Sequence, residues 1–138
     1  MKQRQPQRPK LPKVSEQMKA WSTALAGEVE VWPAVSTRSF FGFTALYRKE
    51  KIFAALPRTR AWGTESSLAF KLESPAPAIG SRLETDERIG VTLMSKARWY
   101  TFELLSDADV HDALDWLALA YEAAGYKAAG KKTNKKLR

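Results

Sequence analysis

Hydrophobic positions follow a helical period near the end of the chain. Counting from Val110, apolar residues fall at offsets 0, 3, 4, 7, 11 and 14, which form one stripe on a helix of about four to five turns. Ser106 is suited to begin this helix and Gly125 to end it. Trp116 lies off the stripe, and we expect it to pack at its edge against Trp21 rather than to mark an exposed partner surface.

The middle of the chain alternates between apolar and polar positions and predicts strands. The expected elements, in chain order, are a helix near 15–26 that Gly27 ends, strands at 40–47, 52–56 and 68–73, a short helix through Ile79 and Leu83, strands at 89–93 and 98–105, and the long helix. Gly42 is expected to lie inside the first strand, as a bulge or at a close approach of the backbone to a neighbouring segment. The order α-β(3)-α-β(2)-α predicts an α+β fold, an antiparallel sheet of about five strands packed by helices.

Charge divides the chain into three parts. The 138 residues carry a net charge of +8. The two ends together contribute +11, because residues 1–14 and 127–138 hold basic residues and no acid, and the middle contributes −3. Prolines among the basic residues of 1–14 leave nothing that could build a core. The sequence therefore predicts disordered basic tails at 1–14 and 127–138 around a single domain at 15–126.

Composition excludes several classes of protein. The absence of cysteine excludes disulfides, thiol nucleophiles and cysteine-ligated metal centres. No apolar run approaches the roughly 20 residues of a membrane helix, and the basic N-terminus lacks the apolar region of a secretory signal. We therefore expect a cytoplasmic protein without a membrane partner. Serine-nucleophile motifs, phosphate-binding glycine loops and paired catalytic carboxylates are also absent, so we expect neither an enzyme nor a cofactor.

Two basic regions are candidates for contact with nucleic acid. Arg58 and Arg60 place two guanidinium groups, which pair with phosphates, beside Trp62, whose indole can stack on a base. The tails neutralise phosphates without reading sequence, and the C-terminal candidates are Lys131, Lys132, Lys135 and Lys136. The alternatives are an ordinary loop with solvated charges and tails that only keep the protein soluble.

The only histidine, His111, has Asp107 and Asp115 one helical turn away on either side. This spacing is compatible with a metal or pH-sensitive site and with a solvated polar helix face. A metal ion needs more converging ligands than the spacing supplies, so we predict a polar face and no metal.

Short motifs in the first half read R-S-F-F-G-F at 38–43, Y at 47, E-K-I-F-A at 50–54 and L-A-F-K at 68–71. They resemble the N-terminal domain of TfoX-like proteins, whose core reads roughly R-x-M-F-G-G, Y, G-K-M-F-A and L-x-x-K. The later runs W-Y-T-F at 99–102 and A-Y-E at 120–122 look like the related YjbR group, and the chain also resembles a small luciferase-like family. The resemblance covers about residues 15–125 and implies the same α-β(3)-α-β(2)-α arrangement.

These features predict a non-enzymatic binding or regulatory domain of the TfoX N-terminal/YjbR type, whose basic tails contact nucleic acid weakly and in a salt-sensitive way. The alternative is a small-molecule or protein-binding scaffold with inert tails, in which the aromatic sheet and Trp99 hold an apolar or anionic ligand. The sequence leaves the identity of the ligand, a protein partner and the oligomeric state open.

Overall fold

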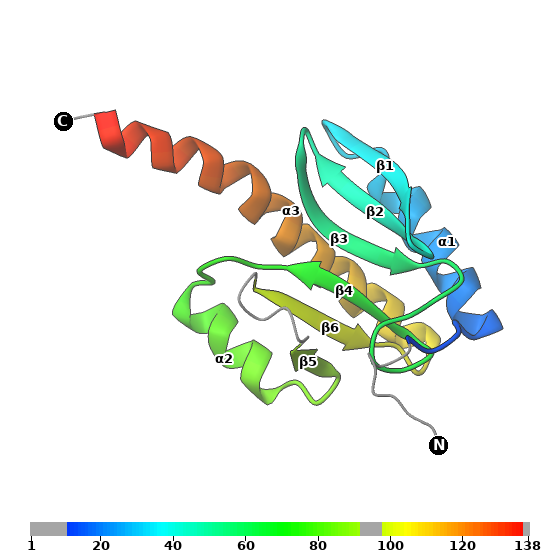
Figure 1. The fold of residues 1–138 in the computed structure, drawn as a ribbon. Helices are drawn as coiled ribbons and strands as arrows, with labels where there is room; N and C mark the ends of the chain where they lie inside the picture. The colour runs from blue at the N-terminus through cyan, green and yellow to red at the C-terminus, as the bar shows by residue number, and fades with distance from the viewer. Residues whose placement is uncertain (1–10, 92–97, 137–138) are drawn as a thin grey trace, which may run out of the picture.

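One antiparallel sheet of six strands, in the order β1-β2-β3-β4-β6-β5, organises the fold (Figure 1). This computed structural model describes residues 11–91 and 98–136, with side chains as far as residue 125. The elements are α1 (Glu16–Val29), β1 (Val35–Phe40), β2 (Phe43–Arg48), β3 (Lys51–Pro57), β4 (Ser67–Lys71), α2 (Pro77–Thr85), β5 (Ile89–Val91), β6 (Trp99–Glu103) and α3 (Asp107–Lys136). The predicted α+β class with an antiparallel sheet is confirmed. Within the described ranges, no helix combines the length and apolarity needed to cross a membrane.

The sheet has one strand more than predicted, because the run 40–47 is a hairpin rather than a single strand. Phe41 and Gly42 form the turn between β1 and β2, both with positive φ, at 42° and 89°. Gly42 is therefore a turn residue rather than a bulge inside a strand. The close approach expected as the alternative is present, because a Cβ at this position would lie 2.9 Å from Thr59 Oγ1. β1 escaped detection because it consists mainly of Ser, Thr and Arg residues that are exposed, and so it carries no alternation of apolar positions.

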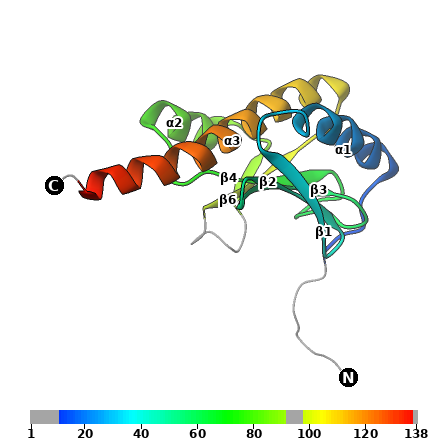
Figure 2. The same cartoon turned by 90° about the horizontal axis from the view of Figure 1, so that it is seen from above.

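The buried core lies between the sheet and the two helices α1 and α3, which cover the same face of the sheet (Figure 2). Strand register and burial assign the helix-facing side chains, which include Leu46, Leu56, Leu68, Phe70 and Phe102. A β-bulge opposite Leu46 and Tyr47 lets two consecutive residues of β3, Phe53 and Ala54, join this core. The Phe53 ring meets the Tyr121 ring of α3 edge-on, with 5.7 Å between centroids.

Both predicted glycine helix ends are wrong. Helix α1 continues through Gly27 to Val29, and Val29 is fully buried. Helix α3 continues through Gly125 to Lys136, so the expected disordered tail from residue 127 is helical over 127–136. A glycine within a helix costs only about 1 kcal/mol relative to alanine, and the burial of one more large apolar side chain offsets that cost at Gly27.

At Gly125 the reason for glycine is close approach. A Cβ at this position would overlap the Arg48 guanidinium, which lies across α3. Arg48 Nη1 donates a hydrogen bond to the Tyr121 backbone carbonyl at 3.0 Å, and its Cζ lies 4.2 Å from the centre of the Tyr121 ring. Arg48 therefore fastens the β2 end of the sheet to α3, and the missing side chain at Gly125 makes room for it.

Tryptophan packing also differs from the expectation. Trp116 was expected at the edge of the stripe against Trp21, but it is fully buried. Its ring stacks on the Phe70 ring of β4 at 5.4 Å, and the Arg82 guanidinium of α2 lies 4.6 Å from its centre. Trp21 instead donates a hydrogen bond from Nε1 to Asp107 Oδ1 at 2.9 Å and so links α1 to the start of α3.

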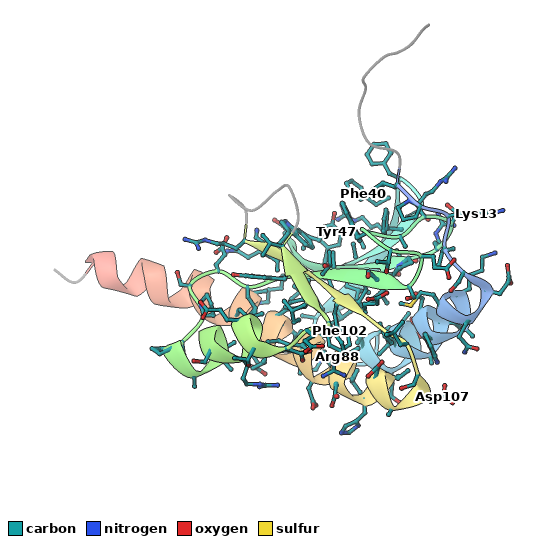
Figure 3. All side chains as sticks on the ribbon, turned by 90° about the horizontal axis from the view of Figure 1, so that it is seen from below. Lys13, Phe40, Tyr47, Arg88, Phe102 and Asp107 are labelled. Carbon is teal, nitrogen blue, oxygen red and sulfur yellow. The ribbon has the colours of Figure 1, made fainter. Side chains whose placement is uncertain are left out.

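Arg88 joins the end of α2, β6 and α3 (Figure 3). It donates hydrogen bonds to Asp86 at 2.9 Å, Asp109 at 2.7 Å and Asp112 at 3.0 Å, and its Cζ lies 4.7 Å from the centre of the Phe102 ring. The hydrogen bond from Arg88 lowers the pKa of Asp86 below its ordinary value of 3.8.

The pKa of Asp109 is lowered as well. Burial raises it, but hydrogen bonds from the Leu105 backbone and from Arg88 outweigh that effect. The Asp109 carboxylate also accepts the Ser106 backbone N–H at 3.2 Å, as the acid of a capping box does at the start of a helix.

We expect Arg88→Met to lower the free energy of unfolding at pH 7 by about 2 kcal/mol, because it leaves partly buried carboxylates without their cation. Both folded-state carboxyl pKa values are lowered, so this stabilisation is present above pH 4 and is lost as the pH falls through the folded pKa values. Urea unfolding at pH 7 and pH 3 checks this. The control is Lys19→Gln, which breaks only the exposed pair with Glu16, and a difference that stays constant with pH would contradict the assignment.

A double-mutant cycle tests the contact between Arg48 and Gly125. In the Arg48→Ala background, Gly125→Ala should raise the free energy of unfolding by about 1 kcal/mol, the ordinary helix gain. In the native background it should give no gain, because the new methyl group displaces the Arg48 side chain from the Tyr121 carbonyl. Urea denaturation of the four proteins measures the coupling, and additive effects would show that the two residues are independent.

Candidate nucleic-acid interface

The residues predicted to contact nucleic acid lie at two separate places. Arg58, Arg60 and Trp62 belong to the loop 58–66 between β3 and β4. The four C-terminal candidates, Lys131, Lys132, Lys135 and Lys136, belong to the last turns of α3, which projects beyond the sheet and away from that loop (Figures 1 and 2). Their side chains lie outside the described part of the structure. The structure therefore does not bring the two groups together.

The loop is built around the backbone carbonyl of Gly42. Three consecutive backbone N–H groups donate to this one oxygen, from Arg58 at 2.9 Å, Thr59 at 2.9 Å and Arg60 at 3.2 Å. Successive N–H groups that converge in this way form a nest, which in many proteins holds a phosphate. Here a protein carbonyl fills the nest, so only the side chains of the loop remain to bind an anion.

The N-terminal segment 11–14 runs alongside this loop and pairs with it through backbone hydrogen bonds. Val14 N–H donates to the Thr59 carbonyl at 3.1 Å, and Ala61 N–H donates to the Pro12 carbonyl at 3.0 Å. Arg60 Nη1 donates to the Leu11 carbonyl at 3.3 Å, and Lys13 is paired with Arg60 in an isolated bridge. The predicted start of the ordered domain at residue 15 is therefore too late. The sequence hid this contact because it consists of backbone hydrogen bonds that leave no pattern of side chains.

Three cations gather at this end of the sheet: Lys13, Arg58 and Arg60. All three are exposed, and none forms an ion pair with another residue of the described part of the chain. One exposed acid, Glu65, lies in the same loop. Four further basic residues of the N-terminal segment precede Leu11 in the sequence: Lys2, Arg4, Arg8 and Lys10. The local charge is therefore positive.

Trp62 does not present its indole as freely as the sequence suggested. Its ring lies 4.8 Å from the Phe43 ring, and its buried Nε1 has no hydrogen-bond partner among the described residues. The exposed aromatic residues of the described part of the chain are instead Phe40, which is 43% exposed, and Phe41, which is 84% exposed. Phe40 is the last residue of β1, and Phe41 lies between it and Gly42. Figure 3 shows Phe40 and Lys13 at the same end of the sheet.

We call Lys13, Phe40, Phe41, Arg58 and Arg60 the basic–aromatic end. The aromatic part of this surface was not predicted from the sequence, because Phe40, Phe41 and Phe43 were all assigned to one strand. Three aromatic residues within four positions cannot all face the same side of a strand, and this was the available signal.

His111 is exposed, and Asp107, expected beside it, accepts the hydrogen bond from Trp21. Among the described residues, no group of three or more histidine, aspartate or glutamate side chains is placed to hold a metal ion.

The alternative prediction was a scaffold that holds a ligand on an aromatic face of the sheet. The sheet face away from the helices instead has small residues at its centre. Strand pairing aligns Ala45, Ala55 and Ala69 across β2, β3 and β4 on the face away from the helices, and all three are buried. Trp99, the expected ligand-binding aromatic residue, is only 8% exposed.

A groove with a mostly apolar lining lies elsewhere, between α1 and the ends of β2 and β3. Lys19, Glu30 and Arg58 border it, and Ser22 and Thr44 contribute hydroxyl groups. Ser22 Oγ is buried and has no hydrogen-bond partner among the described residues.

Comparison of the chain with models of protein families, with curated proteins and with solved structures finds no match. The resemblance to TfoX-like and YjbR-like domains therefore depends on the short sequence motifs alone.

Two glycine substitutions test how the loop is held. Gly42→Ala should lower the free energy of unfolding by about 2 kcal/mol, because the residue has φ 89° and the new Cβ would lie 2.9 Å from Thr59 Oγ1. Gly63→Ala is the matched control, since Gly63 has φ 73° in the same loop but nothing within 4 Å of a new Cβ. It should cost only the backbone strain, about 1 kcal/mol. Equal losses in urea denaturation would show that Gly42 is required for its φ alone.

Proposed function

We propose that this protein is a non-enzymatic binding module that contacts nucleic acid through its basic–aromatic end. One observation carries the proposal: two basic segments far apart in the sequence, around Lys13 and around Arg58, are hydrogen bonded into a single surface. An ordinary solvated loop needs no such partner segment.

The chemistry of the surface suits phosphate. Arg58 and Arg60 present planar guanidinium groups that can pair with phosphate oxygens in a bidentate way, and no carboxylate of the described chain competes for them as an ion pair. The Arg60 side chain is only lightly engaged, through one hydrogen bond of 3.3 Å to a backbone carbonyl. Lys2, Arg4, Arg8 and Lys10 precede Leu11 in the sequence and add to the positive charge of the N-terminal segment.

The C-terminal lysines act in this proposal as a second, independent contact. They belong to the far end of α3, so a ligand that reaches only the basic–aromatic end does not touch them. Their contribution is expected for long nucleic acids and not for short ones.

A second candidate is a scaffold for a small anionic molecule with inert tails. The groove beside α1 favours it, because the cations Lys19 and Arg58 line it together with the buried Ser22 hydroxyl, which has no hydrogen-bond partner among the described residues. One acid, Glu30, also lines the groove. Arg58 borders both surfaces, so the two candidates are separated by the residues that only one of them uses: Lys13 and Arg60 for nucleic acid, and Ser22 for the groove.

A salt titration of the full chain tests the first candidate. Binding to a short oligonucleotide should weaken linearly in log–log form with salt. Replacing Lys13, Arg58 and Arg60 by Gln should reduce the slope by about 2, at about 0.7 per phosphate contact on a single strand.

The matched control replaces three exposed basic residues elsewhere, Lys49, Lys51 and Arg98, by Gln, which changes the net charge equally. The control should leave the slope nearly unchanged. Equal losses in both triple variants would contradict a defined surface, and no binding by the native chain at low salt would overturn the proposal.

A further inference from the structure

We infer that the Phe40–Phe41 turn is a base-stacking element, so that the nucleic acid bound at the basic–aromatic end is single-stranded. This inference rests on the proposed function and specifies its ligand. It comes from three observations at the turn between β1 and β2: its backbone conformation, its exposure and its neighbours.

The backbone of the turn is unfavourable for the residue it carries. Two residues connect the paired positions Phe40 and Phe43, and both have positive φ, as in a type I′ turn. Asn-Gly is the preferred sequence for this turn, and Gly42 fits it. Phe41 does not, since a bulky side chain at positive φ strains the backbone.

The ring that causes this strain contributes little to the core. Phe41 is 84% exposed, and its ring contacts the ring of the neighbouring Phe40, at 4.9 Å between centroids. The other large apolar side chains that are exposed in the described chain are aliphatic and lie apart from one another: Val31, Val91 and Leu105. The backbone strain and the exposure of the ring both lower the stability of the folded state. Phe41 is therefore better explained by a ligand that binds its ring than by a role in folding.

The neighbours of the ring indicate the chemistry of that ligand. Gly42 is in contact with Thr59 and Arg60, so the turn sits directly against the cationic loop. An anion with a flat apolar face satisfies both parts of such a surface, and a nucleotide is such an anion: the phosphate meets the cations and the base stacks on the ring.

The rest of β1 favours a nucleobase over a lipid chain. The strand behind the rings carries the hydroxyl side chains of Ser36, Thr37 and Ser39, which are exposed and would have to lose water if the turn entered a bilayer. A base edge is polar and can stay hydrated while its face stacks. Bases within a duplex are already stacked on each other, so the ring selects single strands.

The test uses the full chain and the substitution Phe41→Asn, which introduces the preferred Asn-Gly turn. The folded structure should be kept, with an unchanged or higher midpoint of urea unfolding. Phe41→Tyr keeps an aromatic face, and Phe41→Leu keeps an apolar side chain without one. Val31→Asn is the matched control, because Val31 is 77% exposed and follows α1, outside the basic–aromatic end.

Fluorescence anisotropy measures binding to four probes: an oligothymidylate of about twelve nucleotides, a duplex of the same length, inorganic polyphosphate, and vesicles of anionic phospholipid. We expect Phe41→Asn and Phe41→Leu to weaken oligothymidylate binding about tenfold with an unchanged salt slope. Phe41→Tyr and Val31→Asn should bind like the native chain. Polyphosphate has no bases, so its binding should be the same in all of these proteins.

Three results would overturn the inference. Oligothymidylate binding that is unchanged in Phe41→Asn, while the Lys13, Arg58 and Arg60 triple variant still weakens it, leaves the proposed function standing and removes the stacking role. Vesicle binding that Phe41→Asn abolishes and Phe41→Leu retains assigns the turn to a membrane surface instead. Failure of the native chain to bind any nucleic acid removes the proposed function itself, and the inference with it.

Discussion

The carbonyl oxygen of Gly42 is the contact on which the architecture of the basic–aromatic end depends. It accepts three backbone N–H groups of the β3–β4 loop, and that loop in turn holds the N-terminal segment through Thr59 and Ala61. Without this oxygen, the three N–H groups would need another acceptor, and the loop would have no fixed relation to the β1–β2 turn. One glycine carbonyl thus relates three segments that the sequence places far apart.

Arginine residues have two different roles in this domain. Some stabilise the fold and others are free to bind an anion, so the net charge alone does not show how many are available to a ligand. Arg48, Arg82 and Arg88 lie over aromatic rings of the core, and the guanidinium of Arg88 is also neutralised by carboxylates. Arg48 joins β2 to α3, Arg82 joins α2 to α3, and Arg88 joins β6 to α3. Arg58 and Arg60 lie in the loop and have no such partners among the described residues. A count of basic residues does not separate these groups, because the separation depends on which rings and acids the fold brings near them.

The sequence predicts the parts of the fold that side-chain periodicity encodes. The stripe of α3 from Val110 and the alternation in β4 and β6 mark real elements, and the α+β class follows from their order. Periodicity fails where the contacts are made by the backbone or by the absence of a side chain. Gly125 was interpreted as a helix end although it makes room for Arg48, and β1 has no apolar pattern because both of its faces are largely exposed. The candidate site was found only in part, because Phe41 lies in a tight turn that was assigned to the interior of a strand.

The continuation of α3 past Gly125 determines how far the C-terminal lysines lie from the rest of the domain. Eleven residues separate Gly125 from Lys136, and a helix of that length extends about 16 Å. The last lysines are thereby carried away from the sheet, in the direction opposite to the loop that holds Arg58 (Figure 1). The backbone of α3 therefore places Lys131, Lys132, Lys135 and Lys136 far from Arg58 and Arg60, and the positive charge of the chain is not gathered on one surface. A single partner that contacts both groups must be long, and a short partner contacts one group at a time.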